Sequence, residues 1–269
     1  MENTFLFRNK NIHYRVEGKG DCIVLLHGFL ESLHIWDYFI TELCKTFQVI
    51  CIDLPGHGKS ECIEEVHTMK LMANVVLSVL NFLNVNQSVM IGHSMGGYVT
   101  LQFAEQYPEK LKGFGLFHSH AAADSEEAKK NRERTIDIIQ KDHLGFISNF
   151  IPDLFAAENV QKYKGAIEIL KKSAFQTPKE GIIAALKGMK ERSSKINLLK
   201  NTSSPVLFII GKEDKRIPIE SIQEQIALPA HSETLILDKI GHMGYIEAQS
   251  VTLLTLKFFL NKIYHQSRV

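Results

Sequence analysis

Apolar residues along this chain occur in short runs separated by longer amphipathic stretches. Residues 5–18, FLFRNKNIHYRVEG, alternate apolar and polar side chains around a polar RNKN centre, which predicts a β-hairpin. Six further runs are continuously apolar or β-branched, as in strands covered on both faces of a parallel sheet: CIVLLHG, FQVICIDL, SVMIG, KGFGLFHS, PVLFIIG and ETLILD. The pattern therefore predicts a mostly parallel sheet.

Helical periodicity fills the intervals between these runs. Residues 69–83, MKLMANVVLSVLNFL, place apolar side chains at spacings of three and four, and Thr68 ahead of them suits an N-cap. Regular alternation of strand and helix predicts an α/β fold, in which a twisted sheet has helices on both faces and right-handed crossovers.

The alternation stops after His120. No strand-like run occurs in residues 121–200, where charged helical patterns take over, and strand-like text resumes at Pro205. Such an interruption indicates an insertion between two strands of one continuous sheet. We therefore predict a core made of residues 1–120 and 201–269, with a helical insert, residues 121–200, after the sixth core strand.

The predicted insert is rich in charge. It holds 15 Lys and Arg against 11 Asp and Glu, an excess that we interpret as a solvated helical surface, with an anion-binding patch as the alternative. Its last helical pattern opens with Thr177, Pro178 and Glu180. This segment predicts a capping box with proline at the first helical position.

Composition indicates the class of protein. The chain has 269 residues, 45% of them hydrophobic, and a formal net charge of +1, which is typical of a globular protein with a large core. This balance does not favour binding to nucleic acid or to an acidic membrane surface. No apolar stretch reaches the roughly 18 residues of a membrane-spanning helix, and the N-terminal text lacks the apolar segment of a signal peptide. No feature of the sequence specifies an oligomeric state.

The four cysteines have no metal-binding spacing, and two of them lie in apolar runs: Cys22, Cys44, Cys51 and Cys62. We expect them to be small core residues in the reducing cytoplasm. Neither a zinc-binding HExxH pair nor a phosphate-binding glycine loop occurs, so no metal and no cofactor is expected.

The text GHSMGG, residues 92–97, lies between a predicted strand and a predicted helix. A strand that ends in Gly-x-Ser-x-Gly and turns sharply into a helix holds its serine, here Ser94, in a strained conformation with the hydroxyl exposed. Side chains at Gly92 and Gly96 would collide with the neighbouring strand and helix. The backbone N–H of Met95 then faces the place where an oxyanion would form. The motif predicts a nucleophilic serine.

Five segments, in their order and spacing, resemble the α/β-hydrolase family over nearly the whole chain: LLHGF at 25–29, DLPGHGKS at 53–60, GHSMGG at 92–97, IIGKED at 209–214 and GHMGYIE at 241–247. The resemblance implies an α/β-hydrolase fold whose helical insert is a lid over the serine. It implies a Ser-Asp-His triad in that chain order, here Ser94, Asp214 and His242. The backbone N–H of Phe29, in the short HG form of the oxyanion loop, would be the second oxyanion donor.

The implied triad residues suit their roles. Ser94 needs a base within hydrogen-bond reach, and an imidazole such as that of His242 can both accept and return a proton near neutral pH. Asp214, three residues after PVLFIIG, would hold that imidazole in the correct tautomer. Three other carboxylates remain candidates for the acid: Glu213, Asp238 and Asp124.

Further side chains complete the predicted site. Three histidines are interpreted as loop-fixing groups: His27, His57 and His93. The substrate pocket is expected among apolar residues of the insert and a histidine just before it: Phe146, Phe150, Leu154, Phe155 and His118.

The predicted site supports acyl transfer to water through a covalent acyl-enzyme. We therefore predict a serine hydrolase that cleaves small carboxylic esters or related carbonyl substrates. Two alternatives would use the same residues. One is a C–C bond hydrolase or a pyruvate-eliminating lyase of menaquinone synthesis, and the other is a ligand-sensing protein with negligible turnover.

Overall fold

The structure, a computed structural model, describes residues 2–266, and these contain a sheet of eight strands in the order β1-β2-β4-β3-β5-β6-β7-β8. The strands are β1 (Glu2–Phe7), β2 (Lys10–Glu17), β3 (Cys22–Leu26), β4 (Gln48–Ile52), β5 (Ser88–His93), β6 (Leu111–Phe117), β7 (Val206–Gly211) and β8 (Ser232–Leu237). β1 and β2 form the predicted hairpin, and β2 pairs antiparallel with β4. All pairs from β4 to β8 are parallel, which confirms the predicted α/β fold.

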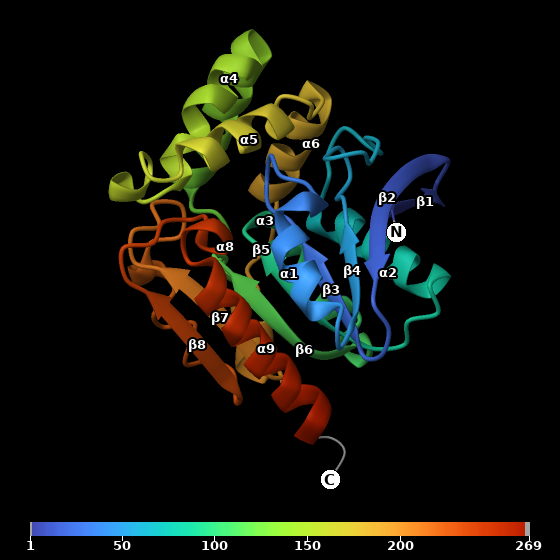
Figure 1. The fold of residues 1–269 in the computed structure, drawn as a ribbon. Coiled ribbons are helices and arrows are strands. Elements are labelled where there is room, and N and C mark those ends of the chain that lie inside the picture. Colours follow the sequence, from blue (N-terminus) through green and yellow to red (C-terminus); the bar gives the residue numbers. More distant parts are fainter. Residues whose placement is uncertain (1, 267–269) are drawn as a thin grey trace.

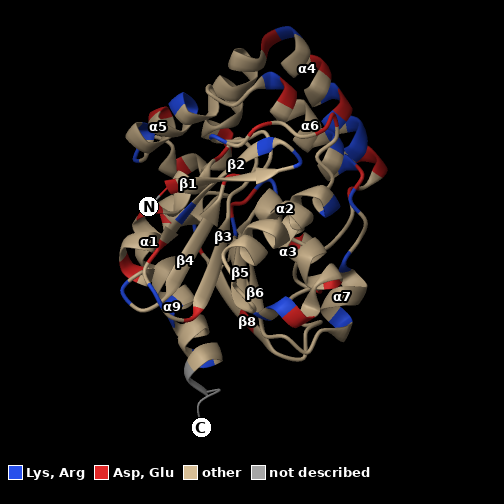
Figure 2. Ribbon diagram, turned by 90° about the vertical axis from the view of Figure 1, so that its right-hand side faces the viewer, with Lys and Arg blue, Asp and Glu red and all other residues tan. Residues whose placement is uncertain are grey.

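Helices cover both faces of this sheet. One face carries α1 (Asp37–Leu43) and α9 (Gln249–Gln266), and the other carries α2 (Met69–Phe82), α3 (Met95–Gln106) and α7 (Ile196–Asn201) (Figures 1 and 2). The short helix α8 (Gly244–Glu247) precedes α9. Five 3₁₀ helices lie in the described connections: η1 (Leu33–Trp36), η2 (Pro108–Lys110), η3 (Pro152–Leu154), η4 (Ala157–Asn159) and η5 (Ile219–Ser221). No helix among residues 2–266 combines the length and apolarity that crossing a membrane requires.

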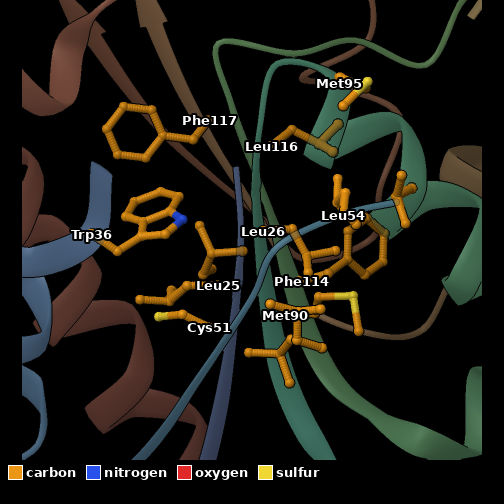
Figure 3. Close-up of a cluster of buried hydrophobic side chains, with 14 of the residues drawn as sticks. Leu25, Leu26, Trp36, Cys51, Leu54, Met90, Met95, Phe114, Leu116 and Phe117 are labelled. Carbon is orange, nitrogen blue, oxygen red and sulfur yellow. The ribbon is translucent and has the colours of Figure 1, made fainter. Parts of the chain in front are cut away.

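The core lies between the sheet and its helices. Leu25 and Leu26 are consecutive in β3 and point to opposite faces of the sheet, Leu25 toward Trp36 and Leu26 toward Met90 (Figure 3). Trp36 also packs edge-on against Phe117, with ring centroids 5.8 Å apart. All five residues of β3 are buried. Burial on both faces explains why the sequence of this strand is continuously apolar and not alternating.

Two helix starts test the capping predictions. Thr68 caps α2 as predicted, because its hydroxyl oxygen accepts the N–H of Leu71 at 3.0 Å. The capping box predicted at Thr177 is wrong. Helix α6 (Lys179–Lys190) has Pro178 at its N-cap, with extended backbone and no side-chain cap hydrogen bond. Thr177 therefore lies one residue too early to cap this helix.

Between β6 and β7 the chain forms helices and no strand. Besides α6 and α7, this segment contains α4 (Glu126–Phe150) and α5 (Lys164–Ala174). Helices α4, α5 and α6 stand over the carboxyl edge of the parallel strands (Figure 1). α4 is kinked at Asp142, whose φ is −150° and ψ is 84°, and the Asp142 carboxylate accepts the N–H of Gly145 at 2.8 Å. The boundaries predicted for the insert, residues 121–200, stay a prediction.

Candidate active site

Ser94 lies at the turn from β5 into α3, at the carboxyl edge of the sheet. Its φ of 48° and ψ of −114° fall in a region that non-glycine residues seldom adopt. The carbonyl of Ser94 accepts the N–H of Gly97 at 2.9 Å and the hydroxyl of Ser119 at 2.8 Å, which closes the turn. A Cβ added at Gly92 would lie 2.2 Å from the carbonyl oxygen of Gly96. Only glycine at this position permits the turn.

His242 and Asp214 meet on neighbouring loops at the same edge. His242 Nδ1 donates to Asp214 Oδ2 at 2.7 Å, and both side chains are buried. The other carboxylate oxygen accepts the N–H groups of Arg216 at 2.8 Å and Ile217 at 2.9 Å. Burial alone would raise the pKa of Asp214, but His242 and His118 hold that pKa far below its usual value. A charged carboxylate on the Nδ1 side leaves Nε2 of His242 as the proton acceptor.

The other carboxylates considered for the acid lie elsewhere. Asp124 forms ion pairs with two arginines of the insert, Asp238 pairs with an exposed lysine, and Glu213 is exposed. Of the four sequence candidates, Asp214 is the one that the structure brings into contact with His242.

His118 is a second hydrogen-bond partner of Asp214 and does not line the pocket. Its Nδ1 donates to Asp214 Oδ2 at 3.0 Å, and its side chain is completely buried. Its Nε2 has no partner and faces Gly244, where an added Cβ would lie 2.3 Å away. Burial lowers the pKa of His118 to about 4, although Asp214 acts in the opposite direction. A neutral His118 therefore helps to orient the Asp214 carboxylate.

His118, Asp214 and His242 also place three possible metal-ligand atoms within 4.8 Å of one another. Both imidazoles direct a nitrogen at the same carboxylate oxygen, and hydrogen bonding accounts for that closeness. The arrangement suits a triad with a supporting histidine.

Glu31, which the sequence analysis does not single out, joins three segments of the site: the loop after β3, the end of β5 and α8. Its Oε2 accepts the N–H of Gly28 at 2.6 Å and the Nδ1–H of His93 at 2.8 Å, and its Oε1 accepts the hydroxyl of Tyr245 at 2.9 Å. His93 Nε2 donates in turn to the carbonyl of His242 at 3.0 Å. Burial alone would lower the pKa of His93 and raise that of Glu31, but their mutual attraction reverses both shifts. Both shifts favour the charged forms of the pair.

The predicted oxyanion donors flank Ser94 from two elements. Met95 opens α3, so its N–H is one of the first helix N–H groups, which have no partner inside the helix. Phe29 belongs to the loop after β3. His27 holds this loop in place with two hydrogen bonds. His27 Nδ1 donates to the carbonyl of Gly28 at 2.7 Å, and its Nε2 accepts the N–H of Leu54 at 2.9 Å. The oxyanion roles of Phe29 and Met95 stay predictions.

A cavity of about 310 Å³ lies beside Ser94 and His242, walled partly by α4 and α6. Three of the expected pocket residues line it: Phe146, Phe150 and Leu154. Phe155 and His118 are not among its lining residues. Phe155 is fully buried, and its ring packs against Tyr163 with the centroids 6.2 Å apart.

The insert is joined directly to the loop that carries His242. The N–H of His242 donates to the carbonyl of Leu154 at 2.7 Å. The Glu247 carboxylate accepts the N–H of Ala156 at 3.0 Å and that of Gly241 at 3.1 Å. The position of His242 therefore depends on the insert as well as on the sheet.

Comparisons with known proteins agree with this fold. Residues 21–133 match a family model described as the alpha/beta hydrolase fold. A thermophilic esterase from Thermogutta terrifontis is 30% identical, with a TM-score of 0.92 over 98% of this chain and 99% of that one. An uncharacterized hydrolase of Bacillus subtilis (strain 168) is 29% identical over 244 residues, 86% of each chain. An enol-lactonase from Burkholderia xenovorans LB400 is 21% identical and shares the fold, with a TM-score of 0.89 over 96% of this chain and 100% of that one.

Proposed function

This chain belongs to the α/β-hydrolase family, and we propose that it is a serine hydrolase that cleaves small carboxylic esters. The observation that carries the proposal is the contact of His242 with a charged, buried Asp214, beside a cavity that His242 lines together with the strained Ser94. The name of the Thermogutta esterase, 30% identical over nearly the whole chain, supports an ester as the substrate.

The reaction proceeds in two halves. Ser94 Oγ attacks the ester carbonyl while His242 Nε2 takes the hydroxyl proton, and His242 then returns that proton to the departing alcohol. A water molecule, deprotonated by His242, attacks the resulting acyl-enzyme, and the carboxylic acid leaves with Ser94 restored. In both halves the N–H groups of Phe29 and Met95 stabilise the negative charge on the carbonyl oxygen. Asp214 stabilises the imidazolium.

We further propose that residues 121–200 act as the lid of this site. Helices α4 and α6 supply cavity-lining side chains, and the carbonyl of Leu154 holds the backbone of His242. The free thiols of all four cysteines support the expected cytoplasmic location.

A panel of p-nitrophenyl esters from acetate to decanoate, assayed beside a C–C cleavage substrate, tests the proposed reaction. We expect steady turnover of the short esters, with kcat of about 1 s⁻¹ or more. Cleavage of the C–C substrate alone would assign the site to the C–C bond hydrolases. A folded protein that turns over no member of the panel would contradict an enzymatic role on esters and would favour ligand sensing.

A further inference from the structure

We propose that the substrate of this site carries, besides its ester group, a free carboxylate that Arg132 binds. The inference deepens the proposed function and rests on it. The cavity lining includes Arg132, an arginine on α4 that the catalytic machinery does not use.

Arg132 belongs to a helix face that turns into the cavity. Ala128, Asn131 and Thr135 line the cavity with it, at the spacing of one helix face. The Nε and Nη2 groups of Arg132 bind Asp124, while Nη1 lies 3.6 Å from the sulfur of Met189, another lining residue. A thioether is only a weak acceptor. One edge of the guanidinium thus reaches the cavity wall without a strong acceptor.

The carboxylate behind Arg132 does not neutralise it fully. Asp124 also accepts Nη1 of Arg192 at 2.6 Å, so one carboxylate serves two guanidinium groups. Arg192 and Asp124 have side chains only 4% and 5% exposed. The nearby His120 adds no further positive charge, because burial lowers its pKa to about 4 and leaves it neutral. This cluster therefore carries one surplus positive charge.

A second cluster on the cavity repeats the pattern. Asp153 accepts both Arg216 Nη2 at 2.7 Å and Lys215 Nζ at 3.0 Å, and both cations line the cavity. The one carboxylate in the cavity lining, Glu31, is hydrogen-bonded to His93. The cavity wall around Arg132, Lys215 and Arg216 therefore carries a surplus of positive charge, which attracts an anionic substrate.

Arg132 is the more buried of the two arginines that line the cavity. Along the ribbon of α4 and α6, Lys and Arg positions alternate with Asp and Glu positions (Figure 2). The side chain of Arg132 is only 20% exposed and that of Arg216 is 37% exposed. Water and salt screen a charge less where it is partly buried, so Arg132 is the stronger carboxylate anchor and Arg216 chiefly attracts the substrate to the entrance.

The cavity offers the two environments that such a substrate needs. Phe146, Phe150 and Leu154 supply an apolar wall for methylene groups, and Arg132 supplies the charged end. Pockets for small molecules measure about 300–1,000 Å³, so this one, at about 310 Å³, suits a short substrate. The free carboxylate belongs either to the acid portion, as in a hemi-ester of a short dicarboxylic acid, or to the alcohol portion.

Two pairs of esters test the inference and distinguish these sources. Monoethyl glutarate against ethyl pentanoate places the charge on the acid side, and para-acetoxybenzoate against phenyl acetate places it on the alcohol side. In each pair the ratio of kcat/KM, charged over neutral, is measured. We expect a ratio of about ten or more in at least one pair, falling about tenfold or more in Arg132→Gln, since a hydrogen bond between charged groups is lost.

Two further variants complete the test. Lys130→Gln removes one charge from the exposed side of the same helix and should leave both ratios unchanged. Arg132→Lys keeps the charge and loses the planar fork, so it should give an intermediate ratio, and it serves as the test if Arg132→Gln does not fold. Ratios near one in both pairs for the wild type would overturn the inference, and so would ratios that Arg132 variants do not change.

Binding of glutarate, measured by isothermal titration calorimetry on the wild type and the Arg132 variant, separates this inference from the proposed function. Ester turnover without any preference for charge would overturn the inference alone. If the protein turned over none of the esters, the proposed function would be overturned. Glutarate binding that depends on Arg132 would then still support the carboxylate site. If neither ester turnover nor Arg132-dependent glutarate binding were observed, the proposed function and the carboxylate site would both be overturned.

Discussion

At the residue scale, Glu31 has the widest influence on the site, because it holds the oxyanion loop, the residue beside the nucleophile and the loop of His242 together. In Glu31→Gln, one amide oxygen cannot replace two carboxylate oxygens, and His93 loses its counter-charge. We expect the free energy of unfolding to fall by about 3 kcal/mol or more. We also expect kcat to fall by about tenfold or more with a smaller change in KM, because oxyanion donors are displaced. Urea unfolding and steady-state kinetics measure the two effects.

Glu64→Gln is the matched control for this change. Glu64 is half exposed and makes a surface ion pair with Arg8 at 2.9 Å. The same chemical change there should alter the free energy of unfolding by only about 0.5 kcal/mol and leave kcat unchanged. A Glu31→Gln protein indistinguishable from Glu64→Gln in both measurements would show that the buried pair does not organise the site.

Sequence motifs predict the triad Ser94, Asp214 and His242, because each residue lies in a short segment whose sequence is informative by itself. Glu31 was not singled out, and His118 was assigned to the pocket and not to Asp214, because the partners of both residues are distant in the sequence. Glu31 meets His93 across 62 residues, and His118 meets Asp214 across 96. Only the order of the strands in the sheet brings such residues together, and no local pattern encodes that order.

At the element scale, α4 shapes both ends of the cavity. The kink at Asp142 divides the helix, so that Arg132 lies on one half and Phe150 on the other. Phe150 stacks on Phe146, with the ring centroids 5.1 Å apart, and meets Phe29 edge-on at 5.9 Å. It therefore closes the apolar wall beside the oxyanion loop.

Phe150→Ala should open that wall and shift the preference toward longer acyl chains. The change in discrimination between short and long esters should be about 1 to 3 kcal/mol, as for other changes of pocket volume. The ratio of kcat/KM along the p-nitrophenyl ester panel measures it. Leu144→Ala, at a site 46% exposed on the same helix, is the control and should leave the ratio unchanged. An unchanged preference in Phe150→Ala would remove this residue from the substrate pocket.

The elements themselves were largely predictable, since each of the eight strands coincides with an apolar or alternating run. The kink in α4 could not be predicted from the sequence. Asp142 looks like any polar residue of a charged helix, and the break depends on its side chain capping Gly145. At α6 the sequence predicted Thr177 as the N-cap and Pro178 as the first helical residue, but the backbone of Pro178, with φ of −58° and ψ of 136°, is not yet helical.

At the scale of the whole molecule, buried histidines should make the fold sensitive to acid. Burial lowers the pKa to about 3 for His57 and to about 4 for His67, His118 and His120. Unfolded histidines titrate near about 6.5. Between these values the unfolded chain binds more protons than the folded one, so stability falls as the pH falls, by up to about 1.4 kcal/mol per pH unit for each histidine. The raised pKa of His93 opposes this effect, but it is a single group.

Thermal unfolding across the pH range checks this expectation. Because several kcal/mol are involved, Tm should fall by about 10 °C or more between about pH 7.5 and about pH 5. The loss should be steepest between about pH 6.5 and about pH 4. A Tm that stays constant across this range would mean that the four histidines are not held neutral by the fold.

The proposed mechanism depends on Ser94 being the nucleophile. Covalent labelling tests the identity of the nucleophile most directly. After reaction with a small fluorophosphonate, peptide mass spectrometry should find the adduct on Ser94, and the Ser94→Ala protein should carry none. Ester hydrolysis by that variant should be lower by about 10⁴-fold or more, with unchanged circular dichroism. An adduct on another residue, or hydrolysis by folded Ser94→Ala within about tenfold of the wild type, would contradict the serine mechanism.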